Sequence, residues 1–390
     1  MKNKILTGLL LVLIGGWGSL SAQNVGSNYA RQVNTLIGTK GVGLTSGYLY
    51  PGATYPYGMV QFTPSYFSKR SGFVINQLSG GGCEHMGNFP TFPVKGKLKM
   101  SPDNILNYRI NISEEKGHAG YYEAKVQEDI HAKLTVTERT GMASYEYPAD
   151  QQYGTVIIGG GISATPIEQA AIVITAPNKC EGYAEGGNFC GLRTPYKVYF
   201  VAEFDTDALE SGTWKRDELK PNTTFAEGEY SGVYFTFDVN KKKNIQYKIG
   251  VSYVSVENAR ENLKAENSGW DFLQIQNQAE SKWNHYLGKI EVEGSNPDRT
   301  TQFYTHLYRS FIHPNVCSDV NGEYMGADFR VHKSRSKHYT SFSNWDTYRT
   351  QIQLLSILDP EVASDIVISH QLFAEEAGGA FPRWVMTNIE

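Results

Sequence analysis

Residues 343–350 read Ser-Asn-Trp-Asp-Thr-Tyr-Arg-Thr and bring together side chains suited to holding a polar ligand. The Ser or Asn at the start can cap a helix that continues through the apolar residues 352–358, which places Trp345 and Asp346 in its first turn. An indole face covers the C–H groups of a sugar, and a carboxylate accepts hydrogen bonds from its hydroxyl groups. The pattern indicates a sugar contact. It is equally compatible with a Trp345 in the core and an Asp346 that complements the helix dipole.

A second candidate stretch is the glycine-rich segment 79–87, Ser-Gly-Gly-Gly-Cys-Glu-His-Met-Gly. Consecutive glycines allow close backbone approach and unusual dihedral angles. Gly82 leads directly into the polar side chains of Cys83, Glu84 and His85. We interpret the segment as a loop that contacts a ligand, with an ordinary tight turn as the alternative. It is not a phosphate loop, because no Lys-Ser or Lys-Thr pair and no helical pattern follow.

Hydrolysis of a glycosidic bond requires two carboxyl groups that face each other across the bond. Glu375 and Glu376 are neighbours on a predicted helix, so they point about 100° apart and cannot serve one site. Asp319, Glu323 and Asp328 fall in a predicted loop, where we expect surface positions. None of these residues forms an evident catalytic pair.

The elements that would position these groups change in type along the chain. Residues 24–257 predict an antiparallel β-sandwich, because short alternating runs recur between Gly, Pro, Asn and Asp, with no long helix between them. Residues 258–294 predict a linker with one long helix and a short strand at 290–293. Residues 295–390 predict the first helices of an all-α domain. The clearest strand candidates are 59–62, 133–137, 155–158, 197–201, 232–237 and 246–253.

The helical region has recognisable start and stop signals. Asn296 can cap a helix that begins at Pro297, and His306 and His313 are expected to pack on its aromatic face. A later helix starts after Asp359-Pro360 and ends at Gly378-Gly379. Together with the helix after residue 343, these helices have wide apolar faces that need partners. We therefore expect the region to be the beginning of a larger all-α domain.

The composition excludes some functions and supports others. The chain of 390 residues has a formal net charge of -4, which gives no reason to expect nucleic acid or an anionic membrane as a partner. Lys2 and Lys4 precede an apolar run at 5–14, and small residues follow as far as Ala22. This pattern predicts a signal peptide over 1–22 and an exported, periplasmic or extracellular protein, with an uncleaved anchor as the alternative. No other stretch is apolar enough to span a membrane.

Four cysteines are few for an exported chain. Cys180 and Cys190 are close in sequence and could form a local disulfide in an oxidising compartment. Cys83 and Cys317 are expected to be buried thiols or groups that line a site. Cys83 and His85 alone are too few to bind zinc.

Taken together, several segments resemble glycoside hydrolase family 92, the exo-acting α-mannosidases of bacteria. They occur in the family's order from about Asn34 to the C-terminus, and the set is specific although no single segment is. The segments are 33–39 (VNTLIGT), 50–61 (YPGATYPYGMVQ), 79–83 (SGGGC), 119–122 (AGYY), 134–140 (LTVTERT), 345–349 (WDTYR) and 378–379 (GG).

The resemblance implies a β-sandwich followed by an (α/α)6 barrel, with the active site between them. It implies calcium-dependent hydrolysis of a terminal α-mannoside with inversion, in which a Glu is the acid and an Asp activates the water. Mannose-containing glycans would be the partners and Ca2+ the cofactor.

Family members are roughly twice as long, and their acid, base and most calcium ligands lie in the later part of the barrel. The resemblance therefore assigns no catalytic residue and no metal ligand to this chain. It does assign substrate contacts to Trp345, Asp346 and the loop at Gly82 and Cys83, with His85 as a candidate for the next sugar subsite. Residues 76–78 (Asn-Gln-Leu) depart from the His-rich sequence of many members, which leaves the linkage preference open.

Three functions remain compatible with the sequence. The first is the N-terminal part of an α-mannosidase that is inactive on its own. The second is a non-catalytic mannose-binding protein from a shortened gene. The third is a different barrel glycosidase in which Asp346 is the acid. An isolated half barrel leaves apolar faces uncovered, which predicts aggregation of the chain by itself.

Overall fold

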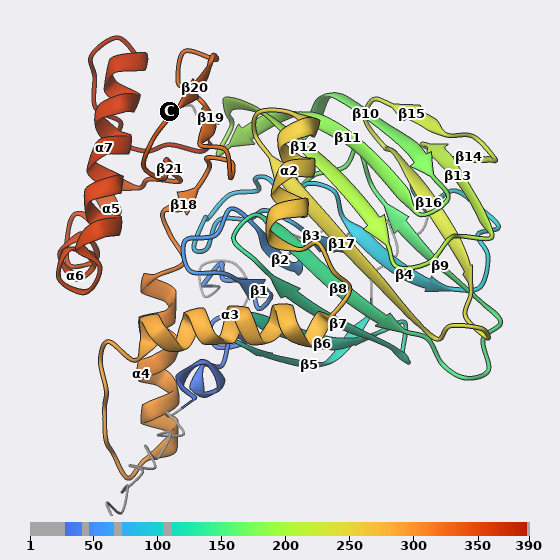
Figure 1. The fold of residues 1–390 in the computed structure, drawn as a ribbon, viewed down its shortest axis with the longest axis horizontal. Helices are drawn as coiled ribbons and strands as arrows, with labels where there is room; N and C mark the ends of the chain where they lie inside the picture. Colours follow the sequence, from blue (N-terminus) through green and yellow to red (C-terminus); the bar gives the residue numbers. More distant parts are fainter. Residues whose placement is uncertain (1–27, 41–46, 66–71, 104–110, 388–390) are drawn as a thin grey trace, which may run out of the picture.

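The computed structural model describes residues 28–40, 47–65, 72–103 and 111–387, so the predicted signal peptide lies outside the described residues. Two large antiparallel sheets are followed by helices, as the strand and helix patterns predict (Figure 1). Among the described helices, none combines the length and the apolar character needed to cross a membrane.

The first sheet has eight strands, with β9 near its centre. Val156 of β9 lies opposite Pro93 on one side and Phe235 on the other. The strands in spatial order are β1 (Ala53–Thr54), β2 (Gln61–Pro64), β3 (Phe73–Val74), β4 (Thr91–Lys95), β9 (Tyr153–Ile158), β16 (Ser231–Asp238), β13 (Glu210–Lys215) and β14 (Glu218–Pro221).

The second sheet has nine strands, and its long strands β10 to β12 carry the alternation of a sheet with one buried face. The strands in spatial order are β15 (Phe225–Glu227), β10 (Ile167–Ala176), β11 (Lys179–Phe189), β12 (Leu192–Phe204), β17 (Asn244–Ser252), β8 (Thr140–Glu146), β7 (Ile130–Val136), β6 (Tyr121–Val126) and β5 (Ile112–His118).

Aromatic side chains from both sheets fill the space between them. Phe73 of the first sheet stacks on Tyr145 of the second, with ring centroids 6.3 Å apart. Phe204 of the second sheet contacts Phe235 of the first at 4.9 Å. All four rings are buried, so their contacts pack the two sheets of the sandwich against each other.

The segment 50–60 joins the sandwich to the helices. Thr54 accepts a hydrogen bond from the Trp283 indole through its carbonyl at 2.7 Å, and its hydroxyl is 2.7 Å from the hydroxyl of Tyr308. Tyr57 donates its backbone N–H to Phe311 and accepts from Val316, each at 2.8 Å. The rigid, Pro- and Gly-rich turn is therefore the junction between the two parts of the molecule.

Two helices, not the one long helix predicted, follow the sandwich: α2 (Val256–Glu266) and α3 (Phe272–Leu287). Asn267, Ser268 and Gly269 are poor helix formers, and the side chain of Asp271 caps the second helix by accepting from Gln274. The strand expected at 290–293 is also absent from the described structure, where these residues are irregular.

Helix α4 (Pro297–Ser310) begins as predicted, with the Asn296 side chain accepting from the first free backbone N–H groups. Leu307 and the following Phe311 are buried on its inner side. His306 is exposed, however, and His313 lies beyond the end of the helix. The prediction that both histidines pack on one helical face is wrong, because the helix ends three residues before His313.

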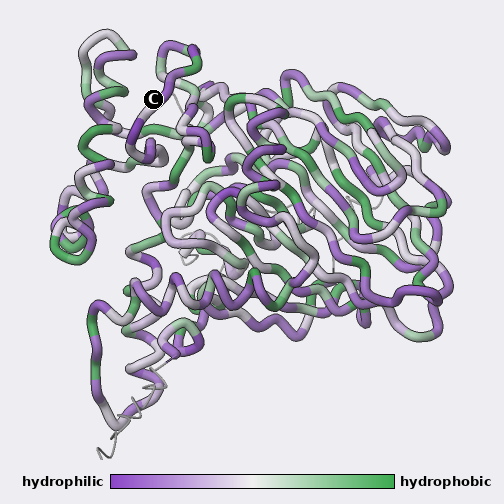
Figure 2. Tube along the Cα trace, in the orientation of Figure 1, coloured by the Kyte–Doolittle hydropathy of each residue, from purple (hydrophilic) through white to green (hydrophobic). Residues whose placement is uncertain are grey.

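The helix expected from residue 343 to 358 is broken into α5 (Asn344–Thr347) and α6 (Gln351–Leu358). Thr350 separates them with a backbone φ of 69°, which no α-helical residue adopts. Helix α7 (Pro360–Glu376) follows, and Gly378 and Gly379 end it with positive φ, as predicted. Figure 2 shows the strongly apolar character of α6.

Between α4 and α5 lie two small sheets, β18 (Asn315–Val316) with β21 (Tyr339–Thr340), and β19 (Glu323–Met325) with β20 (Val331–Lys333). Asp319 precedes β19 and is only 2% exposed, so its predicted surface position is wrong. Its carboxylate accepts hydrogen bonds from Ser252, Asn258 and Asn262. These three donors explain how a charged group is kept inside at the end of the sandwich.

Candidate functional site

A cavity of about 710 Å³ lies between the sandwich and the helical part. It brings together three predicted residues, Gly82 from the glycine loop and Trp345 and Asp346 from α5. Cys83 is not part of the lining, but its disulfide partner Cys190 is. The other lining residues include Leu78, Ser79, Gly80, Gly81, Phe189, His306, Arg309, His313, Ser341, Ser343, Gln351 and Trp384.

Helix α5 presents the side chains of Trp345 and Asp346 to the cavity because hydrogen bonds to the C-terminal segment hold its first residue, Asn344, in place. Asn344 donates its side-chain amide to the Pro382 carbonyl at 2.7 Å, and its backbone N–H to Arg383 at 2.9 Å. Trp345 is 66% exposed, so it is not a core residue. The Ser343 hydroxyl donates to the Asp346 carboxylate instead of capping the helix, which orients that carboxylate at the cavity wall.

The glycine loop is held through consecutive backbone amides. Leu78 donates its N–H to Nε2 of His85, and Ser79 donates to Nε2 of His313, each at 2.8 Å. Gly80 donates to the Tyr48 carbonyl at 2.8 Å. Among the described residues, no group bonds the backbone of the next two glycines at the loop tip, which border the cavity.

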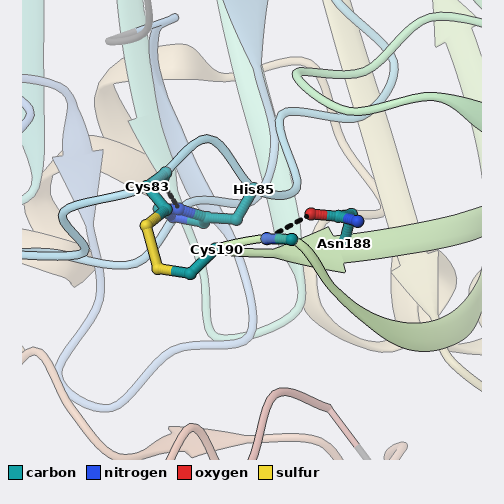
Figure 3. Close-up of a disulfide and its surroundings, with 5 residues drawn as sticks. Cys83, His85, Asn188 and Cys190 are labelled. Atoms are coloured by element: carbon teal, nitrogen blue, oxygen red, sulfur yellow. Dashed lines mark hydrogen bonds between the residues drawn. A yellow bond between two sulfur atoms is a disulfide. The ribbon is translucent and has the colours of Figure 1, made fainter.

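His85 lies beneath the loop and has no exposed surface. Its Nδ1 is 2.7 Å from the Cys83 carbonyl (Figure 3). Its Nε2 accepts a hydrogen bond from the N–H of Leu78. Burial lowers the pKa of His85 to about 4, so the ring is neutral at pH 7 with its proton on Nδ1. In this position His85 supports the loop from inside, and it is not among the residues that line the cavity.

The disulfide in the structure joins Cys83 to Cys190, with the two Cα atoms 5.3 Å apart (Figure 3). The local disulfide between Cys180 and Cys190, which the sequence left open, is not formed, and the expectation that Cys83 is a thiol is wrong. Cys180 and Cys190 sit at opposite ends of β11, and an extended strand of ten residues spans roughly 33 Å, far beyond the reach of a disulfide. Cys180 and Cys317 are buried free thiols, as expected for Cys317.

Cys190 reaches the loop because it forms the tip of the β11–β12 hairpin. Cys190 and Gly191 both have positive φ, 52° and 86°, the conformation of a two-residue type I′ turn. The side-chain oxygen of Asn188 accepts from the N–H of Gly191 and stabilises the turn. A Cys-Gly pair between two β-rich runs was the available signal for this hairpin.

The cavity also contains aromatic groups that the sequence did not suggest. Phe189 and Trp384 stack with centroids 4.5 Å apart at 19°, although they are far apart in sequence. Arg309 faces the same cavity and donates to the carbonyls of Thr35 and Ile37 at 2.9 and 3.2 Å. Only the fold brings these residues together, so no local pattern could have identified them.

Asp346 carries the only carboxylate among the described residues that line the cavity. Within the described ranges, no group of three His, Cys, Asp or Glu side chains is placed to hold a metal ion. The described residues that line the cavity thus supply one carboxylate, which is fewer than the roughly six to eight oxygen ligands that Ca2+ takes.

Two family models match almost the whole chain in succession. The glycosyl hydrolase family 92 N-terminal domain matches residues 32–252, and the family 92 catalytic domain matches residues 258–390. A secreted glycosidase described as uncharacterised, from Arthroderma benhamiae, is 26% identical over 383 residues, which cover 87% of this chain and 48% of that protein.

Solved structures show the same fold. A family GH92 α-mannosidase from Bacteroides thetaiotaomicron has a TM-score of 0.84 at 26% identity, covering 93% of this chain and 52% of that one. A family GH92 inverting mannosidase from the same species has a TM-score of 0.81 at 25% identity, with 93% and 50% covered. The chain thus spans about half the length of these relatives. The match of the family models across both parts means that this chain belongs to glycosyl hydrolase family 92.

Proposed function

We propose that this chain is the N-terminal part of a calcium-dependent, inverting exo-α-mannosidase that acts on mannose-containing glycans. The observation that carries the proposal is the shared cavity, where Gly82 of the sandwich meets Trp345 and Asp346 of α5. An exposed indole beside an oriented carboxylate offers a pyranose both a stacking face and a hydrogen-bond acceptor. The volume of about 710 Å³ lies in the range of small-ligand sites.

The family relatives support the choice of sugar. A GH92 α-mannosidase structure from Bacteroides thetaiotaomicron, at 25% identity and a TM-score of 0.84, is a complex with mannoimidazole. We extend mannose recognition from that protein to this cavity. The secreted description of the Arthroderma benhamiae relative supports the proposed export to the periplasm or the medium.

We further propose that the acid, the base and the calcium ligands lie outside these 390 residues. Glycosidases of this class use two carboxyl groups, and among the described residues that line the cavity Asp346 alone carries one. Three apolar side chains of the helical part are strongly exposed: Ile357 at 76%, Val367 at 67% and Phe381 at 68%. Such faces are normally covered, which supports further helices completing an (α/α)6 barrel.

An assay of the 390-residue chain with an aryl α-mannoside and added Ca2+ tests whether the acid and the base lie outside these residues. We expect no turnover above the buffer rate, because a single carboxylate cannot act as both acid and base. Measurable turnover that is lost in Asp346→Asn would contradict the proposal and identify Asp346 as the acid of a different glycosidase.

A further inference from the structure

The neutral imidazole of His313 provides a hydrogen bond from the helical part to the backbone of the glycine loop. Its Nε2 accepts the N–H of Ser79 at 2.8 Å, and its Nδ1 is 2.7 Å from the side-chain oxygen of Asn315. Asn315 is itself anchored, because its amide donates to the carbonyls of Gly58 and Ile312. An Asn oxygen can only accept, so the proton of His313 resides on Nδ1.

His85 makes the same kind of bond one residue earlier, to the N–H of Leu78 at 2.8 Å. The ring of His85 also fills the space inside the loop, since a Cβ on Gly81 would lie 2.8 Å from its Cε1 atom. Two adjacent amides are therefore drawn inward by two rings, one from each part of the molecule. The backbone of Gly81 and Gly82 is left facing the cavity.

We propose that His313 is a positioning residue. It accepts a hydrogen bond from Ser79 while His85 accepts one from Leu78, and together the two rings hold the glycine loop against the sugar cavity. The ligand would be a terminal mannoside, so this part of the inference rests on the proposed function. His313 acts through Ser79, and the peptide groups at Gly81 and Gly82 make the contact with the sugar. The disulfide of Cys83 fixes the other limb of the loop.

The proposal requires that His313 remain neutral and protonated on Nδ1. Burial lowers its pKa to about 4, and the Asn315 side chain bonds the protonated nitrogen. The titratable or charged groups in its surroundings are His85 behind the loop and His306, Arg309 and Asp346 in the same cavity. In a histidine-labelled ¹⁵N NMR spectrum we expect the neutral Nδ1–H form of His313 from pH 7.5 to 5.0. An Nε2–H form, or titration near pH 6.5, would overturn the proposal.

A matched pair of variants separates the acceptor role from packing. In His313→Gln the side-chain oxygen can still accept from Ser79, whereas His313→Asn keeps a donor for Asn315 but is too short to reach Ser79. We expect the Ser79 amide to exchange its hydrogen at least about tenfold faster in His313→Asn and within about threefold of wild type in His313→Gln. Equal exchange in both variants would overturn the positioning role.

Titration with methyl α-mannoside connects the loop to the ligand. Affinity is expected to fall at least about threefold in His313→Asn and to return to the wild-type value in His313→Gln. If wild type binds no mannoside, the proposed function fails, while the exchange result still decides whether His313 positions the loop. If mannoside binds equally to both variants although Ser79 exchange differs, the inferred role in sugar recognition is wrong.

Discussion

The three glycines of the loop have different roles. A Cβ atom on Gly81 would lie 2.8 Å from the His85 ring, while a Cβ on Gly82 would meet nothing within 4 Å. Gly80 has a φ of 83°, a conformation that other residues rarely adopt. Gly81 is thus needed for the close packing of the loop on His85, whereas a side chain at position 82 would not disturb that packing.

We predict that Gly81→Ala lowers the free energy of unfolding by about 1–3 kcal/mol, because the methyl group displaces a fully buried ring. Gly82→Ala, the matched control, should change it by less than about 0.5 kcal/mol. Urea denaturation followed by fluorescence measures both values. Equal stabilities of the two variants would show that the loop does not rest on His85.

The sequence indicated which residues would line the site, but it did not reveal the contacts that hold them in place. The Trp345-Asp346 pair and the Gly82 loop were recognisable because their chemistry lies in consecutive positions, and the structure brings them to one cavity. The contact between Ser79 and His313 joins residues 234 positions apart, so no local pattern reveals it. His85 was a candidate for a sugar subsite because the sequence around a single polar residue does not show whether its side chain is buried. In the structure this side chain is fully buried.

At the scale of elements, the β11–β12 hairpin and the glycine loop form one unit. The disulfide between Cys83 and Cys190 joins residues 107 positions apart, and the segment between them includes six strands of the second sheet: β5 to β8, β10 and β11. The stacked Phe189 and Trp384 extend this unit to the C-terminal segment. The cavity wall is therefore assembled from the sandwich and the helical part together.

Removing this disulfide should destabilise the chain without changing the fold. We predict that Cys83→Ala/Cys190→Ala lowers the free energy of unfolding by about 2–4 kcal/mol, because the unfolded chain loses a long-range constraint. Thiol titration of unreduced, denatured wild type should find two reactive groups, those of Cys180 and Cys317.

A reductant provides the control for this prediction. It should lower the stability of wild type towards that of the double variant and leave the double variant unchanged. Peptide mapping that recovers Cys180 linked to Cys190 would contradict the pairing described above.

The two breaks between consecutive helices differ in how far the sequence predicts them. The break between α2 and α3 has local signals, since Gly269 and the capping Asp271 stand in the sequence. The break between α5 and α6 falls at Thr350, whose positive φ opposes its local preference. The side-chain amide of Gln351, the first residue of α6, donates to the carbonyls of Ser310 and His313. Sequence periodicity does not reveal these contacts with a distant segment, and it therefore predicted a continuous helix.

At the scale of the whole molecule, buried neutral histidines couple the fold to pH. Burial lowers the pKa of His85 and His313 to about 4 and that of His338 to about 3, from an ordinary value of 6.5. Between pH 6.5 and 4 the unfolded chain binds protons that the folded chain does not. The stabilisation is therefore complete above pH 6.5 and is lost as the pH falls towards 4.

We predict that the free energy of unfolding decreases by about 2 kcal/mol or more from pH 7 to pH 4.5. Urea denaturation at a series of pH values measures the change. The decrease of the free energy of unfolding with falling pH should be smaller in His313→Gln, because glutamine has no titrating ring. A stability that is constant or rises over this range would contradict the neutral, buried state of these histidines.

The order of the two parts was predictable because strands and helices leave different periods in the sequence. The alternation in β11 and β12 and the four-residue spacing from Phe303 to Phe311 both appear in the structure. The arrangement of the parts was not predictable in this way. It depends on contacts of the 50–60 turn with Trp283 and Tyr308, which combine residues from distant segments.

Binding of mannose in the cavity at Trp345 and Asp346 is tested most directly by calorimetric titration of the 390-residue chain with methyl α-mannoside. We predict binding with a Kd of roughly 1 mM and at least about a tenfold loss in Asp346→Ala, because a charged acceptor is removed. Asp298→Ala is the matched control, since Asp298 is also an exposed acid in the first turn of a helix, and it should bind as wild type does. Absence of binding by wild type, or equal binding by the Asp346 and Asp298 variants, would contradict the account.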